Sequence, residues 1–193
     1  MSKGDFFSNF KVSKPEFNLL PAGEHVVRIV RSESTTSFNQ FDGTEKSDLP
    51  AWNDATPQLA ITVVAAEEGK SGGMTHRLNG RGYVKMSELT AEQLASGDFQ
   101  DENGYACTMN DENLLVRVVS EKHTQECANI LNQFANALGI KEGTKLDKGI
   151  EDAKDKGTKF VINIVNKPHG GKDQLRIEKF KMYAAPVAAS FEV

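Results

Sequence analysis

The chain has 193 residues, a hydrophobic fraction of 38% and a formal net charge of −4 at pH 7. These values suit one globular domain with long loops and exclude a uniformly basic nucleic-acid-binding protein. No run approaches the roughly 18 consecutive apolar residues that span a bilayer, and residues 1–14 lack the apolar centre of a secretory signal. We therefore expect no membrane association and a cytoplasmic location. Cys107 and Cys127 lack metal-ligand spacing, which is typical of reduced thiols.

Three strands are expected before residue 90, because β-branched and aromatic residues recur there between turn residues. Their ranges are 23–31, 58–66 and 74–86. A polar, glycine-rich turn at 67–73 joins the second and third strands, so these two should form a hairpin. Gly80 and Gly82 would weaken an ordinary strand, so they predict a bulge, a barrel bend or the close approach of a ligand backbone.

An amphipathic helix over 125–138 is the clearest element of the sequence. Its apolar residues at helical spacing are Cys127, Ile130, Leu131, Phe134 and Leu138. Thr124 is its predicted N-cap, and Gly139 is the glycine that ends it. Two more strands follow at 158–165 and 174–183, and a proline-glycine turn between them predicts a second hairpin.

Three strands, a helix and two strands is the order of an OB barrel, a fold that often binds oligonucleotides or oligosaccharides. We therefore expect a mainly β protein with some α-structure: a five-stranded OB-like barrel with the helix between strands three and four and extended loops. Residues 19–183 would form this single domain, between an N-terminal arm (1–18) and a C-terminal tail (184–193). Insertions at 32–57 and 87–122 interrupt the domain, and loops of this length are usually functional. A mixed sheet with the same element order is the alternative.

Smaller elements are expected within and after the second insertion. Thr90 and Gln93 form a capping box that predicts a short helix. Residues 114–119 could be helix or strand, and residues 142–157 predict one short amphipathic turn.

Charge is unevenly distributed along the chain. Residues 74–86 carry +3 and residues 158–183 carry +4, so the remainder carries −11. Strands three to five therefore hold basic side chains that could follow a phosphate backbone, while the acidic remainder limits indiscriminate binding. The alternative is that edge strands carry lysines only to prevent aggregation. The cations expected to contact phosphates are Arg77, Arg81, Lys85, Lys159, Arg176, Lys179 and Lys181.

Aromatic residues are interspersed with these cations. Single strands are held by bases stacked on exposed rings, each worth roughly 1–3 kcal/mol. The rings expected to stack are Phe38, Phe41, Trp52 and Tyr83. Trp52 is the only tryptophan and the first choice, although such a residue can instead pin a loop to its own domain. Phe160 and Phe180 are expected to fill the core.

Motifs for catalysis or metal binding are not found in the sequence. The glycines at 69–73 and 80–82 do not complete a phosphate loop or a dinucleotide site, and the four histidines are scattered. Paired carboxylates, such as Asp101 with Glu102, fall in hydrophilic turns or on exposed helix, where we expect them to be solvated. We therefore expect that the protein is not an enzyme and that it binds no metal or cofactor.

Several segments carry a resemblance to a known group of proteins. They are 20–29 (LPAGEHVVRI), 57–62 (PQLAIT), and 137–140 (ALGI) before 159–162 (KFVI). With these spacings the chain resembles phage-encoded OB-type single-stranded DNA-binding proteins of replication and recombination. Such proteins often end in an acidic tail with a terminal aromatic residue, whereas residues 184–193 hold Glu192 as their only acid.

The resemblance implies coating of single-stranded DNA without sequence preference during replication, recombination or repair, in the host cytoplasm if the protein is phage-encoded. Replication or recombination proteins would be further partners, and oligomers are an option. The alternative is a structural or adaptor protein of a virion or replication complex that binds no nucleic acid. A hydrolase or nuclease is the least favoured hypothesis, because carboxylates and histidines are not clustered.

Overall fold

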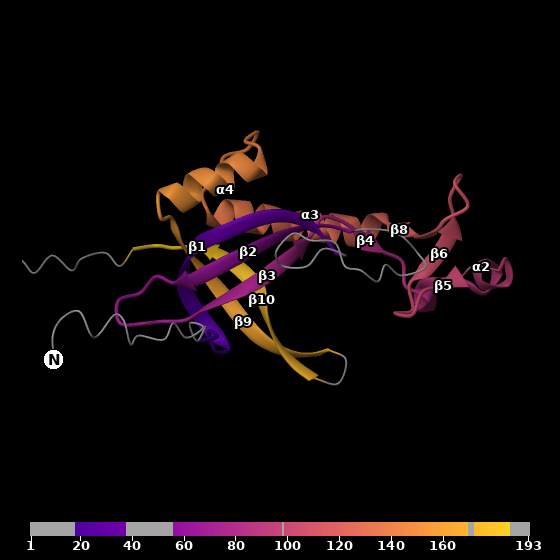
Figure 1. Ribbon diagram of the computed structural model, residues 1–193, viewed down its shortest axis with the longest axis horizontal. Helices are drawn as coiled ribbons and strands as arrows, with labels where there is room; N and C mark the ends of the chain where they lie inside the picture. Colours follow the sequence, from indigo (N-terminus) through magenta and orange to yellow (C-terminus); the bar gives the residue numbers. More distant parts are fainter. Residues whose placement is uncertain (1–17, 38–55, 98, 170–171, 186–193) are drawn as a thin grey trace, which may run out of the picture.

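The computed structural model describes residues 18–37, 56–97, 99–169 and 172–185. Its largest sheet has five antiparallel strands in the order β10–β9–β1–β2–β3 (Figure 1). Their bounds are β1 (Gly23–Thr36), β2 (Pro57–Ala65), β3 (Gly73–Asn79), β9 (Lys159–His169) and β10 (Lys172–Met182). The protein is therefore mainly β, and both predicted hairpins, β2–β3 and β9–β10, are confirmed.

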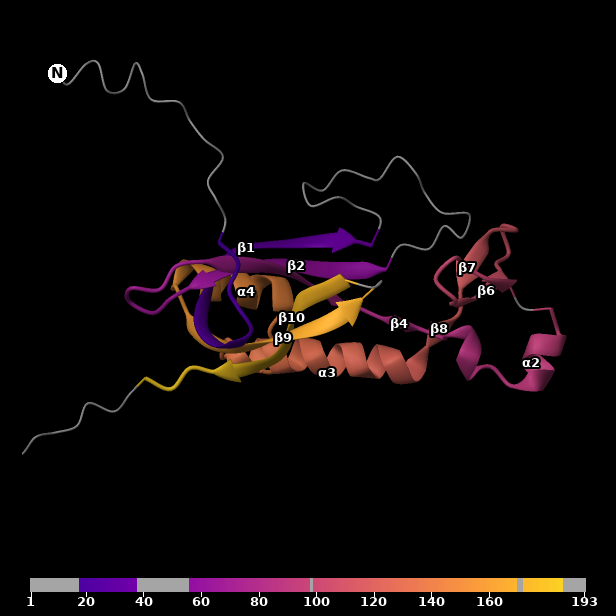
Figure 2. The same cartoon turned by 90° about the horizontal axis from the view of Figure 1, so that it is seen from below.

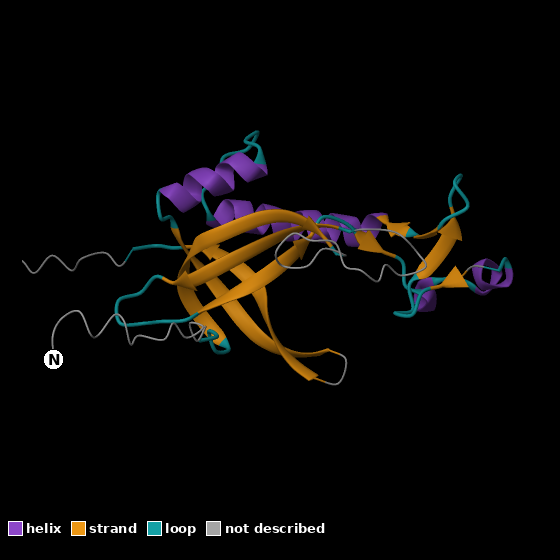
Figure 3. Cartoon of the chain, viewed as in Figure 1, coloured by secondary structure: helices purple, strands orange, loops and turns teal. Residues whose placement is uncertain are grey.

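The expected closed barrel is not found in the described part of the chain. β3 and β10 are the two edges of the sheet, and no strand joins them. Instead, helix α3 (Glu121–Ala137) packs against both edge strands and extends from the sheet to β4 and β8 (Figure 3). The sheet stays open because this helix, rather than a ladder of hydrogen bonds between strands, covers the gap between β3 and β10.

The core lies between the inner face of the sheet and the helices. Phe134 of α3 is fully buried, and its ring centroid lies 6.0 Å from that of Phe160 and 5.1 Å from that of Phe180. A register shift between Ile177 and Lys179 lets both Ile177 and Phe180 face inward, because the extra residue of a bulge reverses the alternation of side chains. The predicted core positions of Phe160 and Phe180 are confirmed.

Both helices that cover the core differ from expectation at their ends. α3 begins four residues earlier than predicted, because the Ser120 hydroxyl caps it and accepts a hydrogen bond from the His123 amide at 3.3 Å. The hydroxyl of Thr124, the predicted cap, accepts a hydrogen bond from the Gly82 amide instead. α4 (Leu146–Asp155) is longer than the single turn expected, and it buries Ile150.

The expected third strand is divided in two. β3 ends at Asn79, and the two-residue strand β4 (Gly82–Tyr83) pairs with β8 (Val119–Ser120). A Cβ at Gly82 would lie 2.2 Å from the Cβ of His123, so only glycine permits the first turn of α3 to lie here. The close approach at this glycine is made by helix α3 of the same chain, rather than by the ligand backbone that was one of the expected roles.

Residues 86–118 form a small unit that we call the projecting module, of which residue 98 lies outside the described ranges. Its elements are the 3₁₀ helix η1 (Met86–Glu88), α2 (Ala91–Ala95), β5 (Phe99–Gln100), β6 (Ala106–Met109) and β7 (Leu115–Arg117). Figures 1 and 2 show it beyond the main sheet, at one end of the longest axis of the molecule. The capping box of Thr90 and Gln93 is confirmed, and the ambiguous run at 114–119 forms strands.

No helix among the described residues has the length and apolar character needed to span a membrane.

Candidate nucleic-acid interface

Two adjoining hollows lie beside α3, and each has a volume of about 430 Å³. The seam hollow lies between the edge strands β3 and β10, and the module hollow lies between β4 and the projecting module. Three residues line both, so the hollows share a wall: Asn79, Cys127 and Ile130. Together they run from the open seam of the sheet to the base of the module.

The seam hollow combines an apolar lining with charged groups. Its apolar side chains include Leu78, Ile130 and Ile177. Its charged side chains are Arg77, Lys167, Arg176 and Glu178. The Lys167 ammonium lies 3.1 Å from the Glu178 carboxylate. The described lining of this hollow therefore carries a net positive charge around an apolar surface.

His76 lies on β3 in the wall of the seam hollow. Burial, and then the nearby charge of Arg176, lower the pKa of its imidazole from 6.5 to about 4. The ring is therefore neutral at physiological pH, with one nitrogen that donates and one that accepts a hydrogen bond. A neutral ring beside a guanidinium suits contact with a nucleobase better than contact with a second cation.

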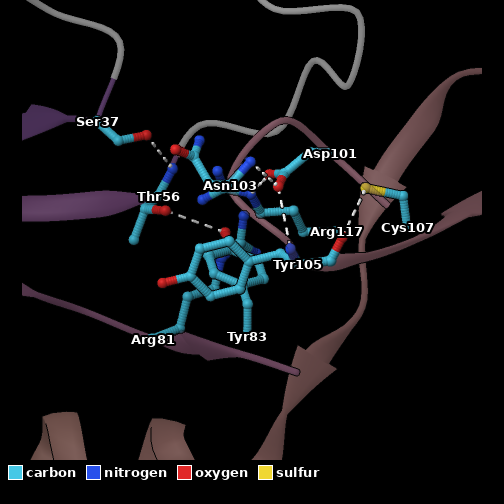
Figure 4. Close-up of polar contacts among 9 residues, drawn as sticks. All are labelled: Ser37, Thr56, Arg81, Tyr83, Asp101, Asn103, Tyr105, Cys107 and Arg117. Carbon is cyan, nitrogen blue, oxygen red and sulfur yellow. Dashed lines mark hydrogen bonds and ion pairs between the residues drawn. The ribbon is translucent and has the colours of Figure 1, made fainter. Parts of the chain in front are cut away.

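The module hollow is centred on a cluster of tyrosines and arginines (Figure 4). The Arg81 Nε donates a hydrogen bond to the Tyr83 hydroxyl at 2.8 Å, and the Arg81 guanidinium carbon lies 5.4 Å from the centre of that ring. The Arg117 guanidinium carbon lies 5.5 Å from the Tyr83 ring and 4.4 Å from the Tyr105 ring. Cation–π contacts at these distances hold the Arg81 and Arg117 guanidinium groups in fixed positions beside the hollow.

A buried ion pair fixes Arg117. Its Nε lies 2.6 Å from Asp101 Oδ2, and the two side chains are 10% and 0% exposed. The second carboxylate oxygen of Asp101 accepts hydrogen bonds from the backbone amides of Asn103 and Tyr105. The expectation that Asp101 is solvated is therefore wrong, because a charge 16 residues away in sequence folds back onto it.

Four of the seven predicted phosphate contacts line the hollows: Arg77, Arg81, Lys85 and Arg176. The other three, Lys159, Lys179 and Lys181, line neither hollow. They lie exposed on the outer face of β9 and β10, and Lys181 forms an ion pair with Glu24 of β1. The predicted cations thus fall into two groups rather than along one channel.

Of the four predicted stacking residues, the structure describes Tyr83. Tyr83 is only 6% exposed, so its ring presents no open face to a base. Phe38, Phe41 and Trp52 lie outside the described residues. The residues that flank their segment, Ser37 and Thr56, both line the module hollow and are joined by hydrogen bonds of 2.9 and 3.1 Å.

Sequence reasoning missed several residues of the hollows. The missed cations are Arg117 and Lys167, and the missed rings are His76 and Tyr105. Arg117 could have been found, since a single charge inside the apolar run LLVRVV indicates a buried and partnered arginine. Lys167 and Tyr105 gave no such signal, because only the tertiary fold brings them to the hollows.

No protein-family model matches this sequence, and a search of curated proteins finds no match. Within the described ranges, no group of three or more His, Cys, Asp or Glu side chains is placed to hold a metal ion. The geometry and charge of the two hollows are therefore the features that bear on function.

Proposed function

We propose that this protein binds single-stranded DNA without sequence preference, with the strand lying along the seam hollow and the module hollow. The observation that carries the proposal is the charge of their lining in a chain whose net charge is −4. The cations are Arg77, Arg81, Lys85, Arg117, Lys167 and Arg176, and the acids are Glu126 and Glu178. Even with Arg117 offset by Asp101, cations exceed acids among the described residues that line the hollows, as a phosphate-binding groove requires.

The strand order adds support by analogy. The order β10–β9–β1–β2–β3, with α3 between β3 and β9, matches an OB barrel whose last pair of strands has not closed. The seam hollow occupies the place where that pair would form. In this proposal the protein is an OB-like relative that uses the open seam as part of its binding groove.

Different side chains of the seam hollow would contact the phosphates and the bases of the DNA. Arg77, Lys167 and Arg176 would contact phosphates, whereas the apolar side chains and the neutral His76 would receive one base. The apolar lining of the hollow can contact the face of an unpaired base, which a duplex keeps stacked inside its helix, so single strands are favoured. The protein would need no cofactor and would act in phage-type replication, recombination or repair, together with proteins of those pathways.

The direct test measures the binding of fluorescein-labelled oligo(dT) by anisotropy at several salt concentrations. The double variant Arg77→Gln/Arg176→Gln should bind more weakly and reduce the slope of log K against log salt by about 0.7 for each lost phosphate contact. A matched control is Lys141→Gln/Lys148→Gln, which removes the same charge from exposed positions that line neither hollow. Equal losses in both variants, or no binding by the unaltered protein, would refute the proposal.

A second experiment locates the strand by thiol protection. Cys127 lines both hollows and is partly exposed, whereas Cys107 is 1% exposed and serves as an internal control. Burial, and then Glu126, raise the pKa of the Cys127 thiol, so labelling with a maleimide is best followed at pH 8 or above. Oligo(dT) should slow labelling of Cys127. An unchanged rate at saturating oligo(dT) would place the strand elsewhere.

A structural or adaptor role is the second candidate, and one observation favours it. Phe99 and Met109 of the projecting module are 54% and 49% exposed and lie on the same face of its small sheet, and exposed apolar side chains that gather on one face are typical of protein-binding surfaces. This role predicts association with protein and indifference to oligonucleotides. Size-exclusion chromatography with and without oligo(dT) separates the two candidates.

A further inference from the structure

The small sheet of the projecting module has an apolar face. In the register of β5, β6 and β7, Phe99 lies opposite Cys107, and Met109 lies opposite Leu115. Cys107 and Met109 are two residues apart on β6, so all four side chains lie on the same face of the sheet. Cys107 is covered, but Phe99 and Met109 are about half exposed. The outer part of this face therefore has no partner among the described residues.

The module around this face is strongly acidic. Residues 86–118 contain seven acids and one base, Arg117, which is already paired with Asp101. The exposed acids are Glu88, Glu92, Glu102, Asp111 and Glu112. Two such modules would repel each other, so the charge disfavours a symmetric contact between module and module.

A surface of complementary character lies on the main sheet. The strand register places the exposed side chains of three neighbouring strands on one outer face: Arg28 of β1, Lys159 of β9, and Lys179 and Lys181 of β10. Half-buried Val26 and Val161, which lie opposite each other on β1 and β9, sit between them. The only acid described on this part of the face is Glu24, so the face, which we call the lysine face, is basic and partly apolar.

The two surfaces lie at opposite ends of the molecule. Figures 1 and 2 both show the module at one end of the longest axis and the last residues of β10 at the other. A contact within one chain is therefore impossible, whereas a contact between two copies pairs acid with base and covers apolar side chains on both. Every copy carries both surfaces, so the partner is always present at matching concentration.

We propose that the projecting module of one copy docks on the lysine face of the next copy, in a head-to-tail contact. Such a contact joins two different surfaces, so it repeats into an open chain of copies rather than closing as a two-fold dimer. The contact is independent of nucleic-acid binding, because the lysine face lines neither hollow. It accounts for the three predicted cations that the fold separates from the hollows.

The test reverses charge on each surface in turn and measures self-association by sedimentation velocity at low salt, without DNA. Variant one is Asp111→Lys/Glu112→Lys in the module, and variant two is Lys159→Glu/Lys179→Glu on the lysine face. Each should lower the association constant at least about tenfold, since like charges then meet across the interface. Mixing the two variants should restore association, because the reversed module of one then meets the reversed face of the other.

The controls separate this result from misfolding and from failure of DNA binding. Recovery in the mixture requires that both variants are folded, and thermal unfolding checks each one alone. Variant one should bind oligo(dT) as the unaltered protein does, because neither substituted residue lines a hollow. An unaltered protein that stays monomeric, a face-reversed variant that still associates, or a mixture without recovery would each overturn the head-to-tail contact. None of these results bears on the proposed DNA groove.

Discussion

The main sheet and the projecting module are stabilised in different ways. The main sheet encloses a continuous apolar core in which Phe134, Phe160 and Ile162 are fully buried. The module buries few apolar side chains, and its described anchor is the ion pair of Asp101 and Arg117 beside two tyrosine rings. Apolar burial in a large core is cooperative, whereas one polar anchor holds a small unit locally. The module should therefore open before the sheet unfolds.

The largest effect is expected from Phe134→Ala. The substitution removes a fully buried ring that contacts Phe160 and Phe180, and it should lower the free energy of unfolding by about 4 kcal/mol. Urea unfolding followed by far-UV circular dichroism measures it. Ile130→Ala on the same helix, at a side chain that is 42% exposed, is the matched control and should cost about 1 kcal/mol. Similar losses for both would contradict the core assignment.

Asp101→Ala should affect the module alone. It leaves the Arg117 charge buried without its carboxylate, at an expected cost of about 3 kcal/mol. Hydrogen exchange should speed up in β6 and β7, while the amides paired between β1 and β9 keep their protection. Glu102→Ala removes a neighbouring exposed carboxylate as a control. Loss of protection throughout the sheet would show that the two regions unfold as one.

The elements of the main sheet were predictable because their patterns are local. Alternating apolar residues specify strands such as 158–165, and helical spacing specifies the helix around Phe134. The open seam between β3 and β10 was not predictable, because whether these two strands pair depends on contacts between residues about 100 positions apart. The bulge that turns both Ile177 and Phe180 inward is likewise set by its partner strand.

The candidate site was predictable only in part, for the same reason. Cationic residues could be found in the sequence, but which of them reach a hollow could not. Arg176 and Lys179 lie opposite residues two positions apart on β9, so both are on the same face of the hairpin, yet only Arg176 reaches the seam hollow. The hydrophilic turn at Asp101 gave no indication of burial, since its partner Arg117 arrives from another strand. Turn propensity predicts the turn at Asp101, but it does not predict which side chains pack against that turn.

His76 makes the seam of the main sheet sensitive to pH. Its folded pKa of about 4 lies below its ordinary value of 6.5, so the unfolded chain binds the proton first as the pH falls. Stability should therefore decline between about pH 6.5 and pH 4, by about 2 kcal/mol at pH 5. The other charged groups at this hollow are Arg77, Lys167, Arg176 and Glu178.

His76→Gln isolates this contribution. The difference in unfolding free energy between variant and unaltered protein should change between pH 7 and pH 5, because glutamine does not titrate. A difference that stays constant from pH 7 to pH 5 would show that the His76 imidazole is not shielded from solvent in the wall of the seam hollow.

The smallest expected effect compares two helix caps. Ser120 caps α3, which packs on the core, whereas Thr90 caps α2, which has no buried residue. Ser120→Ala should lower the global free energy of unfolding by about 1 kcal/mol, because α3 must form for the core to close. Thr90→Ala removes a cap of the same kind, yet it should leave the global value unchanged and only speed hydrogen exchange in α2. Urea unfolding and hydrogen exchange on both variants measure the contrast. If both caps lowered global stability equally, α2 and the module would belong to the same cooperative unit as the core, and the local opening inferred for the module would be wrong.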